Sequence, residues 1–387
     1  MKKVIVLGGG FSGVESSIYL SKLGYDVTLV SNRDYLYMYP AAIWVPTREV
    51  EFEDLCLPLE DFSRVHGFTL KIDMALSVSS KENKVVFADG EEEYDYLVLA
   101  VGAGKVDISG IEHTRTICGP PEDAVEIKEK IDGMIIGNGG RIALGIGDNP
   151  LDLPSMRIGP AVELLLNLDH YLKKQKVRDK FELSFFCPVE NPFAHIGKIV
   201  SKLFMGSFKC CDVPPRMGTA IEGFTADSVI FADGTKLESD LIMLTPGAGG
   251  HPLFKNSDLP LDEAGYVKIG DNCQVDGLAN VFALGDGAEQ KGPEWLVRQG
   301  HNAVVMGRCA AHNIHALETG KGKQSLYTDH LWLGGLLDDG NGAGFLFKNK
   351  KILIVLPLPK LGHWLKKAWV SYWRRSRLNE IPRIFNL

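Results

Sequence analysis

Residues 4–30, VIVLGGGFSGVESSIYLSKLGYDVTLV, decide the fold of this chain. An apolar run leads into three glycines, and a helical segment that Gly24 closes follows before a second apolar run, DVTLVS. A strand, a tight turn, a helix and a second strand in this order predict a βαβ unit with parallel strands.

The turn between the first strand and the helix has glycine in G-x-G-x-x-G spacing, at Gly8, Gly10 and Gly13. The three positions serve a tight turn, close approach of the backbone to a pyrophosphate, and close packing of helix on strand. The helix opens with Phe11 and Ser12, and its free N–H groups would face the phosphates. The spacing therefore predicts a bound dinucleotide, with a merely glycine-rich turn as the alternative.

The second strand of such a unit usually ends in an acidic residue that binds a ribose hydroxyl. Here it ends in Ser31 and Asn32, whose uncharged side chains can still form that hydrogen bond.

Composition narrows the class of protein. The 387 residues suffice for two or three domains, and a net charge of -7 argues against a nucleic-acid binder. The seven scattered cysteines do not suit a secreted disulfide scaffold and favour a reducing cytoplasm. The first residues are expected to form a strand rather than a signal peptide, no apolar run is long enough to cross a membrane, and no metal site is predicted.

Strands and helices alternate along most of the chain, and one pattern occurs twice. KVVFADGEEEYDYLVLAVG (84–102) and SVIFADGTKLESDLIMLTPG (228–247) share a turn followed by a buried strand. We therefore expect an α/β fold with two Rossmann-like dinucleotide-binding domains and a C-terminal region that carries an amphipathic membrane-binding helix. We expect the first domain to consist of residues 1–113 and 263–325. The degenerate second domain would span residues 114–262, and the C-terminal region residues 326–387.

The late segment NVFALGDGAEQ (280–290) resembles the second flavin motif of flavoproteins with two dinucleotide-binding domains. The resemblance implies FAD in the first domain, with Asp286, after Gly285, at the ribityl chain. Residues 100–103, which include Ala100 and Gly102, would lie along the adenosine half. The alternative for Asp286 is an ordinary turn or helix-capping aspartate.

The second unit has a turn that departs from the dinucleotide pattern. Gly145 and Gly147 are followed by Asp148, Asn149 and Pro150, so the third glycine is missing and the helix begins only near residue 160. A carboxylate would repel a pyrophosphate, and proline lacks an N–H donor. We therefore expect this turn to bind NAD(P)H poorly.

Four further segments resemble the sulfide:quinone oxidoreductases, and the similarity extends over nearly the whole chain. They are VTLVSNRDYLYMYPAAIWVP (27–46), RTICGPPEDAVE (115–126), IGPAVELLLNLDHYLKKQKVRDK (158–180) and HIGK (195–198). The resemblance implies FAD, a membrane quinone as electron acceptor, and a small reductant, sulfide or a related sulfur species. It also implies that the second turn lies beside the flavin and holds no nucleotide.

The redox cysteines of that family are only partly present. Cys118 matches the cysteine near the ring edge, but Arg157 and Gly335 stand where two further cysteines are expected. Cys187 or the adjacent Cys210 and Cys211 could replace them, although buried apolar packing explains these residues as well.

Four more side chains are candidates for the site, Arg157 because of its charge and the other three through the resemblance. Arg157 would lie beside the flavin and stabilise a reduced anion or bind an anionic donor, with a surface arginine as an equal alternative. His195 matches an active-site histidine and Glu163 a glutamate near the flavin and the quinone. Arg298 would lie near the pyrimidine end of the flavin.

Residues 360–378 predict an amphipathic helix at a membrane surface. Seven apolar residues fall on one face, and basic residues lie around or beyond it. The apolar residues are Leu361, Trp364, Leu365, Ala368, Trp369, Tyr372 and Trp373. Packing of this face on the protein's own core or on a second copy is the alternative.

The sequence thus predicts an FAD-dependent oxidoreductase that transfers two electrons from a small sulfur donor to a membrane quinone, at the cytoplasmic side of the cell membrane. A type II NADH:quinone oxidoreductase and a flavin-binding protein without turnover are the alternatives. An assembly of identical copies is compatible with the sequence.

Overall fold

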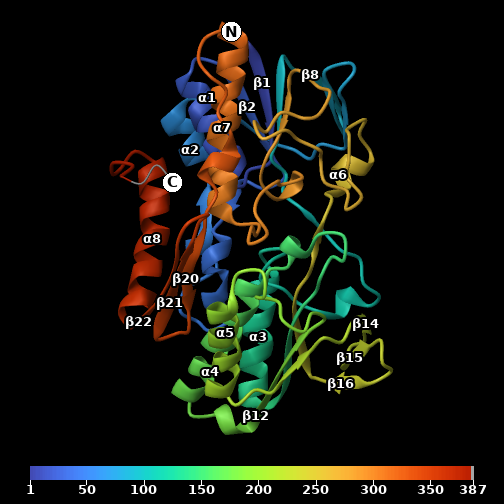
Figure 1. Cartoon of the computed structure of the whole chain (residues 1–387), viewed down its shortest axis with the longest axis vertical. Coiled ribbons are helices and arrows are strands. Elements are labelled where there is room, and N and C mark those ends of the chain that lie inside the picture. Colours follow the sequence, from blue (N-terminus) through green and yellow to red (C-terminus); the bar gives the residue numbers. More distant parts are fainter. Residues whose placement is uncertain (385–387) are drawn as a thin grey trace.

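The computed structural model describes residues 1–384. Figure 1 shows two lobes stacked along the long axis, with the C-terminal helix α8 against one side. The upper lobe contains β1 and β2 with the helices α1 and α7, and the lower lobe contains α3, α4 and α5. The expected α/β class with two Rossmann-like units is confirmed.

The upper lobe is built on five parallel strands in the order β19-β9-β1-β2-β5. Because β9 and β2 lie on opposite sides of β1, the end of β1 is the switch point where α/β sheets bind ligands. The strands are β1 Lys3–Leu7, β2 Asp26–Ser31, β5 Thr69–Ile72, β9 Tyr96–Leu99 and β19 Val281–Ala283. The helices are α1 Phe11–Lys22, α2 Leu59–His66 and α7 Gly300–Thr319.

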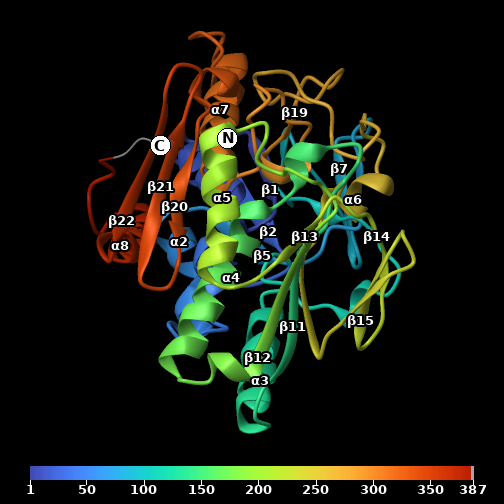
Figure 2. The same cartoon turned by 60° about the horizontal axis from the view of Figure 1, so that its bottom comes forward.

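The lower lobe repeats this plan with four parallel strands in the order β13-β12-β11-β17. Its strands are β11 Gly140–Ile146, β12 Phe181–Cys187, β13 Pro215–Met217 and β17 Leu241–Thr245. Its helices are α3 Asp123–Ile136, α4 Ile158–Lys174 and α5 Lys198–Cys210, and Figure 2 shows α4 next to α5, with α3 near β12. The second turn therefore follows β11, as the first follows β1.

The repeated sequence pattern corresponds to a repeated structure. Each lobe has a three-stranded antiparallel layer that leads into a strand of its main sheet. The layers are β6 Ser77–Ser79, β7 Lys84–Phe87 and β8 Gly90–Glu93 in one lobe, and β14 Ile221–Phe224, β15 Ser228–Phe231 and β16 Lys236–Glu238 in the other.

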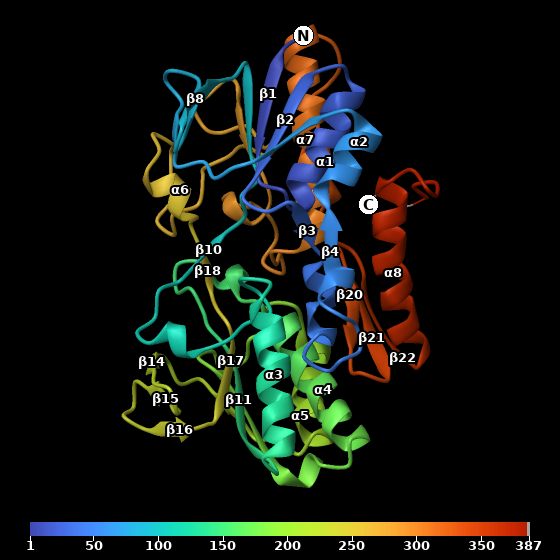
Figure 3. The same ribbon diagram turned by 180° about the vertical axis from the view of Figure 1, so that it is seen from behind.

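Two paired strands connect the lobes. The chain leaves the upper lobe through β10 (Gly104–Lys105) and returns through β18 (Ala248–Gly249), which pairs with β10, as Figure 3 shows. Helix α6 (Pro252–Lys255) follows, and Ser257 and Asp258 bond to Val78 and Ser80 of the upper lobe. These contacts attach Ser257 and Asp258 to the upper lobe, and the expected domain limits stay a prediction.

The C-terminal region forms an antiparallel sheet of β20 (Leu333–Asp338), β21 (Gly342–Lys348) and β22 (Leu353–Pro359), covered by α8 (Leu361–Arg377). Three short elements of the upper lobe lie close to this C-terminal region. They are β3 (Tyr35–Tyr37), β4 (Cys56–Pro58) and the 3-10 helix η1 (Tyr39–Trp44). Within residues 1–384, no helix is long and apolar enough to cross a membrane.

Helix α8 buries several polar side chains and exposes apolar ones, which is the reverse of a helix packed on a protein core. Its buried residues include Lys366, Ser376 and Arg377, whereas Trp364, Leu365 and Trp369 are exposed. Five of the seven residues expected on the apolar face are exposed: Leu361, Trp364, Leu365, Ala368 and Trp369. Tyr372 is half-buried, and Trp373 is buried and packs edge-on against Phe11, with ring centroids 5.0 Å apart. The cations Lys366 and Arg377 were expected around or beyond this face but lie inside the protein because buried carboxylates hold them.

One of these carboxylates belongs to the upper lobe. The fully buried Glu15 of α1 pairs with Arg308 of α7 at 2.7 Å, and with Arg377 and Arg383 at 3.2 Å each. Burial alone would raise the pKa of Glu15, but the three guanidinium groups lower it below its ordinary value. Glu15 therefore stays ionised and ties the C-terminal region to the first helix.

We expect Glu15→Gln to destabilise the protein by about 3–5 kcal/mol, because it leaves buried guanidinium groups without their counter-charge. Since the folded pKa is lowered, the stabilisation by Glu15 is present above the ordinary glutamate pKa of about 4.3 and is lost as the pH falls below it. Urea unfolding between pH 3.5 and 7 measures both effects. Asp132→Asn, which breaks the surface pair with Arg48, is the control and should cost less than about 1 kcal/mol.

Candidate functional site

The intact turn at the end of β1 has the geometry that its glycines predict. A β-carbon on Gly8, which has φ +115°, would lie 2.3 Å from the Ala100 carbonyl oxygen, and one on Gly13 would lie 1.8 Å from the Gly8 carbonyl oxygen. These two glycines are needed for packing. A β-carbon on Gly10 would meet no atom within 4 Å, so this position is open to a ligand.

The residues at the end of β2 lie beside this turn. Ser31 is buried, and its Oγ accepts a hydrogen bond from the Arg33 N–H at 3.2 Å and lies against Gly9. Asn32 is exposed. Arg33 was not predicted from the sequence, yet its Nε is buried without a partner among residues 1–384. An unpartnered buried donor beside the dinucleotide turn fits a bound ligand.

The second turn is filled by the protein itself. A β-carbon on Gly145 would lie 2.0 Å from the Phe186 ring, and one on Gly147 would lie 3.0 Å from the Gly247 nitrogen. The buried Asn149 donates from Nδ2 to the Ala248 carbonyl oxygen at 2.9 Å. The open position found at Gly10 therefore has no equivalent at these two glycines.

The rest of this loop reaches the first unit. Asp152 forms an ion pair with Arg298 at 2.8 Å, and Arg157 forms one with Asp286 at 3.2 Å. Arg157 also donates to the Cys118 carbonyl oxygen at 3.1 Å. The second turn thus contributes two side chains to the end of the site where Asp286 lies, and its position beside a flavin stays a prediction.

The guanidinium group of Arg298 donates hydrogen bonds to the protein from three of its nitrogen atoms. Its Nη1 donates to the carbonyl oxygens of Asp286 and Ala288 at 3.0 and 2.9 Å, while Nε and Nη2 bind Asp152. Its guanidinium also lies 3.8 Å from the Tyr266 ring centroid. These contacts fix the Gly285–Gly287 turn (η6), so Arg298 positions Asp286 whether or not it also touches a flavin.

Cys118 lies near two cationic side chains, Arg157 and Lys105. Burial raises the pKa of its thiol, although Arg157 and Lys105 act to lower it. Burial also lowers the pKa of Lys105, and its Nζ lies against Gly119. Lys105 was missed by sequence reasoning because its segment carries no motif. The cluster surrounds one neutral thiol with two cationic groups.

The segments that carry the two positions without the family cysteines contact each other. A β-carbon on Gly159, two residues after Arg157, would lie 3.6 Å from the Leu337 side chain, and Leu337 is two residues after Gly335 on β20. A β-carbon on Gly335 would meet no atom within 4 Å. The chain carries arginine and glycine at the two positions.

The other cysteines do not supply this pair. Burial raises the pKa of Cys187 to about 11 and that of Cys211 to about 12. Cys210 is exposed at the end of α5. Among the described residues, no contact joins any of the three to Cys118 or Arg157, which favours the structural interpretation of these cysteines.

Glu163 lies at a second centre, under α8. Its carboxylate is buried, pairs with Lys366, and accepts a hydrogen bond from the Asp338 N–H at 2.7 Å. Burial raises the pKa of Glu163 above its ordinary value, although Lys366 acts to lower it. The sequence could not reveal Lys366 as the partner, because a lysine on an amphipathic helix usually faces water.

His195 lies in the loop between β12 and α5. Its Nε2 is buried without a partner in the described part of the chain, and burial lowers its pKa. No hydrogen bond or ion pair within residues 1–384 connects it to Arg157 or Glu163. Its predicted part in proton transfer stays a prediction.

We expect Gly10→Val to fold normally but to lose most of its bound FAD, because the added side chain would occupy the open position where a pyrophosphate approaches. The ratio of flavin to protein absorbance in the purified protein measures the loss, and circular dichroism checks the fold. Gly206→Val is the matched control, since Gly206 also has open space around it but lies on α5. Full FAD content in Gly10→Val would contradict the assignment.

Known proteins resemble this chain over most of its length. The sulfide-quinone reductase of Aquifex aeolicus is 25% identical, with coverage of 98% of this chain and 93% of the relative. A solved structure of the Aquifex aeolicus sulfide:quinone oxidoreductase has a TM-score of 0.86 at 22% identity, with coverage of 99% and 93%. A probable NADH dehydrogenase of Dictyostelium discoideum is 24% identical over 74% of this chain and 67% of its own.

The family profile for pyridine nucleotide-disulphide oxidoreductases matches residues 2–182 and 188–307. Proteins of this family bind FAD. The open position at Gly10, the orphaned Arg33 donor and the Asp286 cluster fit that cofactor. When bound, FAD supplies the two-electron chemistry that protein side chains lack. The chain belongs to the pyridine nucleotide-disulphide oxidoreductase family and is an FAD-dependent oxidoreductase.

Proposed function

We propose that this protein transfers two electrons from a small anionic sulfur donor, through FAD, to a membrane quinone at the cytoplasmic surface of the cell membrane. The observation that carries this proposal is the reversed orientation of α8, which exposes its apolar side chains and places Lys366 against the buried Glu163. The extended similarity to a sulfide-quinone reductase supports the same function.

The exposed apolar surface favours a membrane as the partner. Trp364 is 70% exposed and Leu365 42% exposed on α8, and the neighbouring edge strand β22 exposes Ile354 and Leu356. This strand contains no charged residue, and sequence reasoning used it only to exclude a membrane span. A combined apolar surface with aromatic residues, next to the basic Arg374 and Arg375, is typical of proteins that lie in a bilayer surface.

The two chemical centres lie along one helix. Arg157 precedes α4 and Glu163 lies six residues further on, so about 9 Å of helix separates their backbones. Since Asp286 pairs with Arg157, a flavin at Asp286 would lie near the first turn of α4, and the Glu163–Lys366 pair lies by its second turn. Because a quinone takes up protons when it is reduced, a buried acid–base pair under the membrane-facing helix suits the acceptor side.

The cationic side chains favour an anionic donor. Arg157 and Lys105 flank Cys118, and the paired cysteines of related enzymes are replaced. Guanidinium and ammonium groups in a partly buried cluster attract anions such as hydrosulfide or polysulfide. The filled second turn disfavours NADH as the donor.

Anaerobic stopped-flow measurements test the donor. We expect hydrosulfide or polysulfide to bleach the flavin band near 450 nm, NADH to do so at least about 100-fold more slowly, and Arg157→Met to weaken the anionic donors about 10-fold or more through the loss of charge. Rapid bleaching by NADH would favour an NADH:quinone oxidoreductase. A flavin that no donor reduces would favour a protein without turnover.

Vesicle flotation tests the acceptor side. We expect Trp364→Gln with Leu365→Gln to weaken binding to vesicles that contain anionic lipid at least about 100-fold, because each buried large side chain contributes roughly 1.5–3 kcal/mol. Ile136→Gln, on α3, is the control and should bind as the wild type does, since Ile136 is exposed on the other lobe. Equal binding of the double variant and the wild type would contradict a membrane surface at α8.

Substitution is a sharper test than truncation before α8. Removal of the helix would also expose the buried carboxylates of Glu15 and Glu163, so a truncated protein would lose stability as well as membrane contact.

A further inference from the structure

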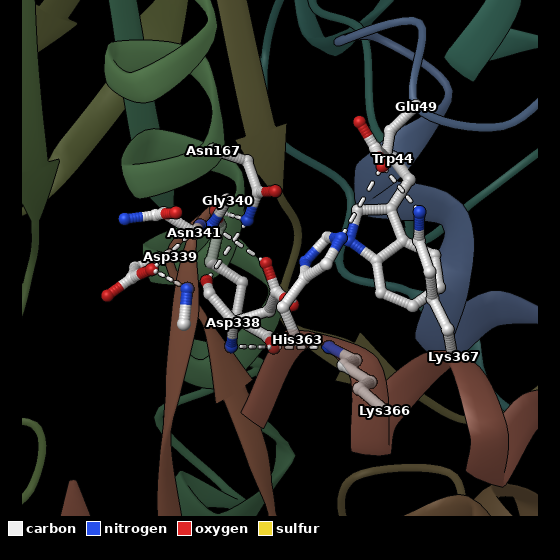
Figure 4. A network of polar contacts seen from close by, with 12 residues as sticks. Trp44, Glu49, Asn167, Asp338, Asp339, Gly340, Asn341, His363, Lys366 and Lys367 are labelled. Carbon is white, nitrogen blue, oxygen red and sulfur yellow. Dashed lines mark hydrogen bonds and ion pairs between the residues drawn. The ribbon is translucent and has the colours of Figure 1, made fainter. Parts of the chain in front are cut away.

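A network of ionisable side chains leads from the protein surface to the Glu163–Lys366 pair. Figure 4 shows its central member, His363 of α8, between two carboxylates. Its Nδ1 lies 2.8 Å from Asp338 Oδ2, and its Nε2 lies 3.4 Å from Glu49 Oε1. An imidazole that contacts a carboxylate through each nitrogen can accept a proton on one side and release one on the other.

The exposure of the side chains changes steadily along this network. Glu49 is 36% exposed, His363 12% exposed and Asp338 fully buried. Glu49 also pairs with Lys367, and the Asp338 carboxylate accepts a hydrogen bond from the Gly340 N–H at 2.8 Å. The outer end can therefore exchange protons with water, whereas the inner end cannot do so directly.

The inner end adjoins Glu163. The Asp338 N–H donates to Glu163, and Asn167 donates to the Glu163 and Asp338 carbonyl oxygens at 2.8 and 3.0 Å. His363 and Lys366 lie one helical turn apart and both lie over the Trp44 ring, whose centroid is 5.7 Å from the imidazole and 5.6 Å from the Lys366 Nζ. The charged groups that face this segment are thus Glu49, Asp338 and Glu163, together with Lys366 and Lys367.

We propose that Glu49, His363 and Asp338 form a proton-transfer path that returns protons from water to the Glu163–Lys366 pair after each quinone reduction. This proposal rests on the proposed function, because it assumes a quinone at α8. The path ends in side chains already assigned to the acceptor side and begins at a carboxylate that neither the donor site nor the membrane surface uses.

A quinone that becomes a quinol gains two electrons, which a reduced flavin would supply, and two protons. The Glu163–Lys366 pair would give both protons to the quinone, one after the other. Each is replaced from Asp338 in its acid form, because Asp338 adjoins Glu163 and its charge acts on that carboxyl group. His363 then passes its Nδ1 proton to Asp338 and receives one from Glu49 at Nε2, and water restores the proton on Glu49. No further oxidant or reductant takes part.

A purely structural role for His363 would leave different traces. Anchoring of α8 needs only hydrogen bonds, which a glutamine can supply, whereas a proton path needs a group that gains and loses protons between about pH 5 and 8. Tests that separate proton supply from packing therefore decide between the two roles.

The experiment compares His363→Gln and Glu49→Gln with the wild type, after anaerobic reduction of the flavin in full-length protein. Reoxidation is followed from pH 6 to 9 with a short-chain soluble quinone and, separately, with ferricyanide, which takes electrons without protons. We expect His363→Gln to slow quinone-dependent reoxidation about 10-fold or more at pH 8–9. The effect should be smaller at pH 6, where protons are abundant, and added imidazole should restore part of the rate.

His113→Gln is the matched control. His113 Nε2 lies 3.8 Å from a carboxylate oxygen of Glu112, but this pair is on the protein surface, away from α8. Glu49→Gln changes only the outer end and should reproduce the pH dependence with a smaller loss. Equal slowing with quinone and ferricyanide, or unchanged quinone rates at every pH, would overturn the path. If quinone does not reoxidise even the wild type, the proposed function itself fails.

Discussion

Two buried ion pairs under one helix organise this molecule. Lys366 and Arg377 are eleven residues apart on α8, which is about three turns, so they point to the same side. One pairs with Glu163 of the lower lobe and the other with Glu15 of the upper lobe. An ionised carboxylate is costly to bury alone, and α8 brings Glu163 its cation and Glu15 one of its three. The helix is therefore fixed across both lobes with its charged face inward.

This constraint determines what the outer surface can do. Since Lys366, Ser376 and Arg377 of α8 are held inside, Trp364, Leu365 and Trp369 face outward. The neighbouring strand β22 also exposes apolar side chains. The same contacts bring His363 over Trp44 and Asp338. A membrane-facing surface and a buried chain of titratable groups thus arise from one arrangement, and the helix that would approach a bilayer also covers the acid–base pair near α4.

The second βαβ unit illustrates how a duplicated turn acquires a new use. Its first two glycines remain because the strands leave no room for a side chain at Gly145 and little at Gly147. The lengthened loop no longer leaves a free helix start for a pyrophosphate, and instead it carries Asp152 and Arg157 to Arg298 and Asp286. The lengthened loop accounts both for the missing third glycine and for these two ion pairs.

The sequence by itself determined the α/β class, the dinucleotide turn, the duplicated units and the amphipathic C-terminal helix, because periodicity and glycine spacing are local properties. It also indicated Arg157 and Glu163, through motifs rather than through contacts. Only the tertiary structure decided that Trp373 packs inward and that Lys366 and Arg377 are buried. It also decided that Lys105 belongs to the Cys118 cluster, and that Asp338 and His363 lie beside the Glu163–Lys366 pair. The physical reason is that the burial of a charge depends on whether a distant segment supplies its partner, and local sequence carries no record of that pairing.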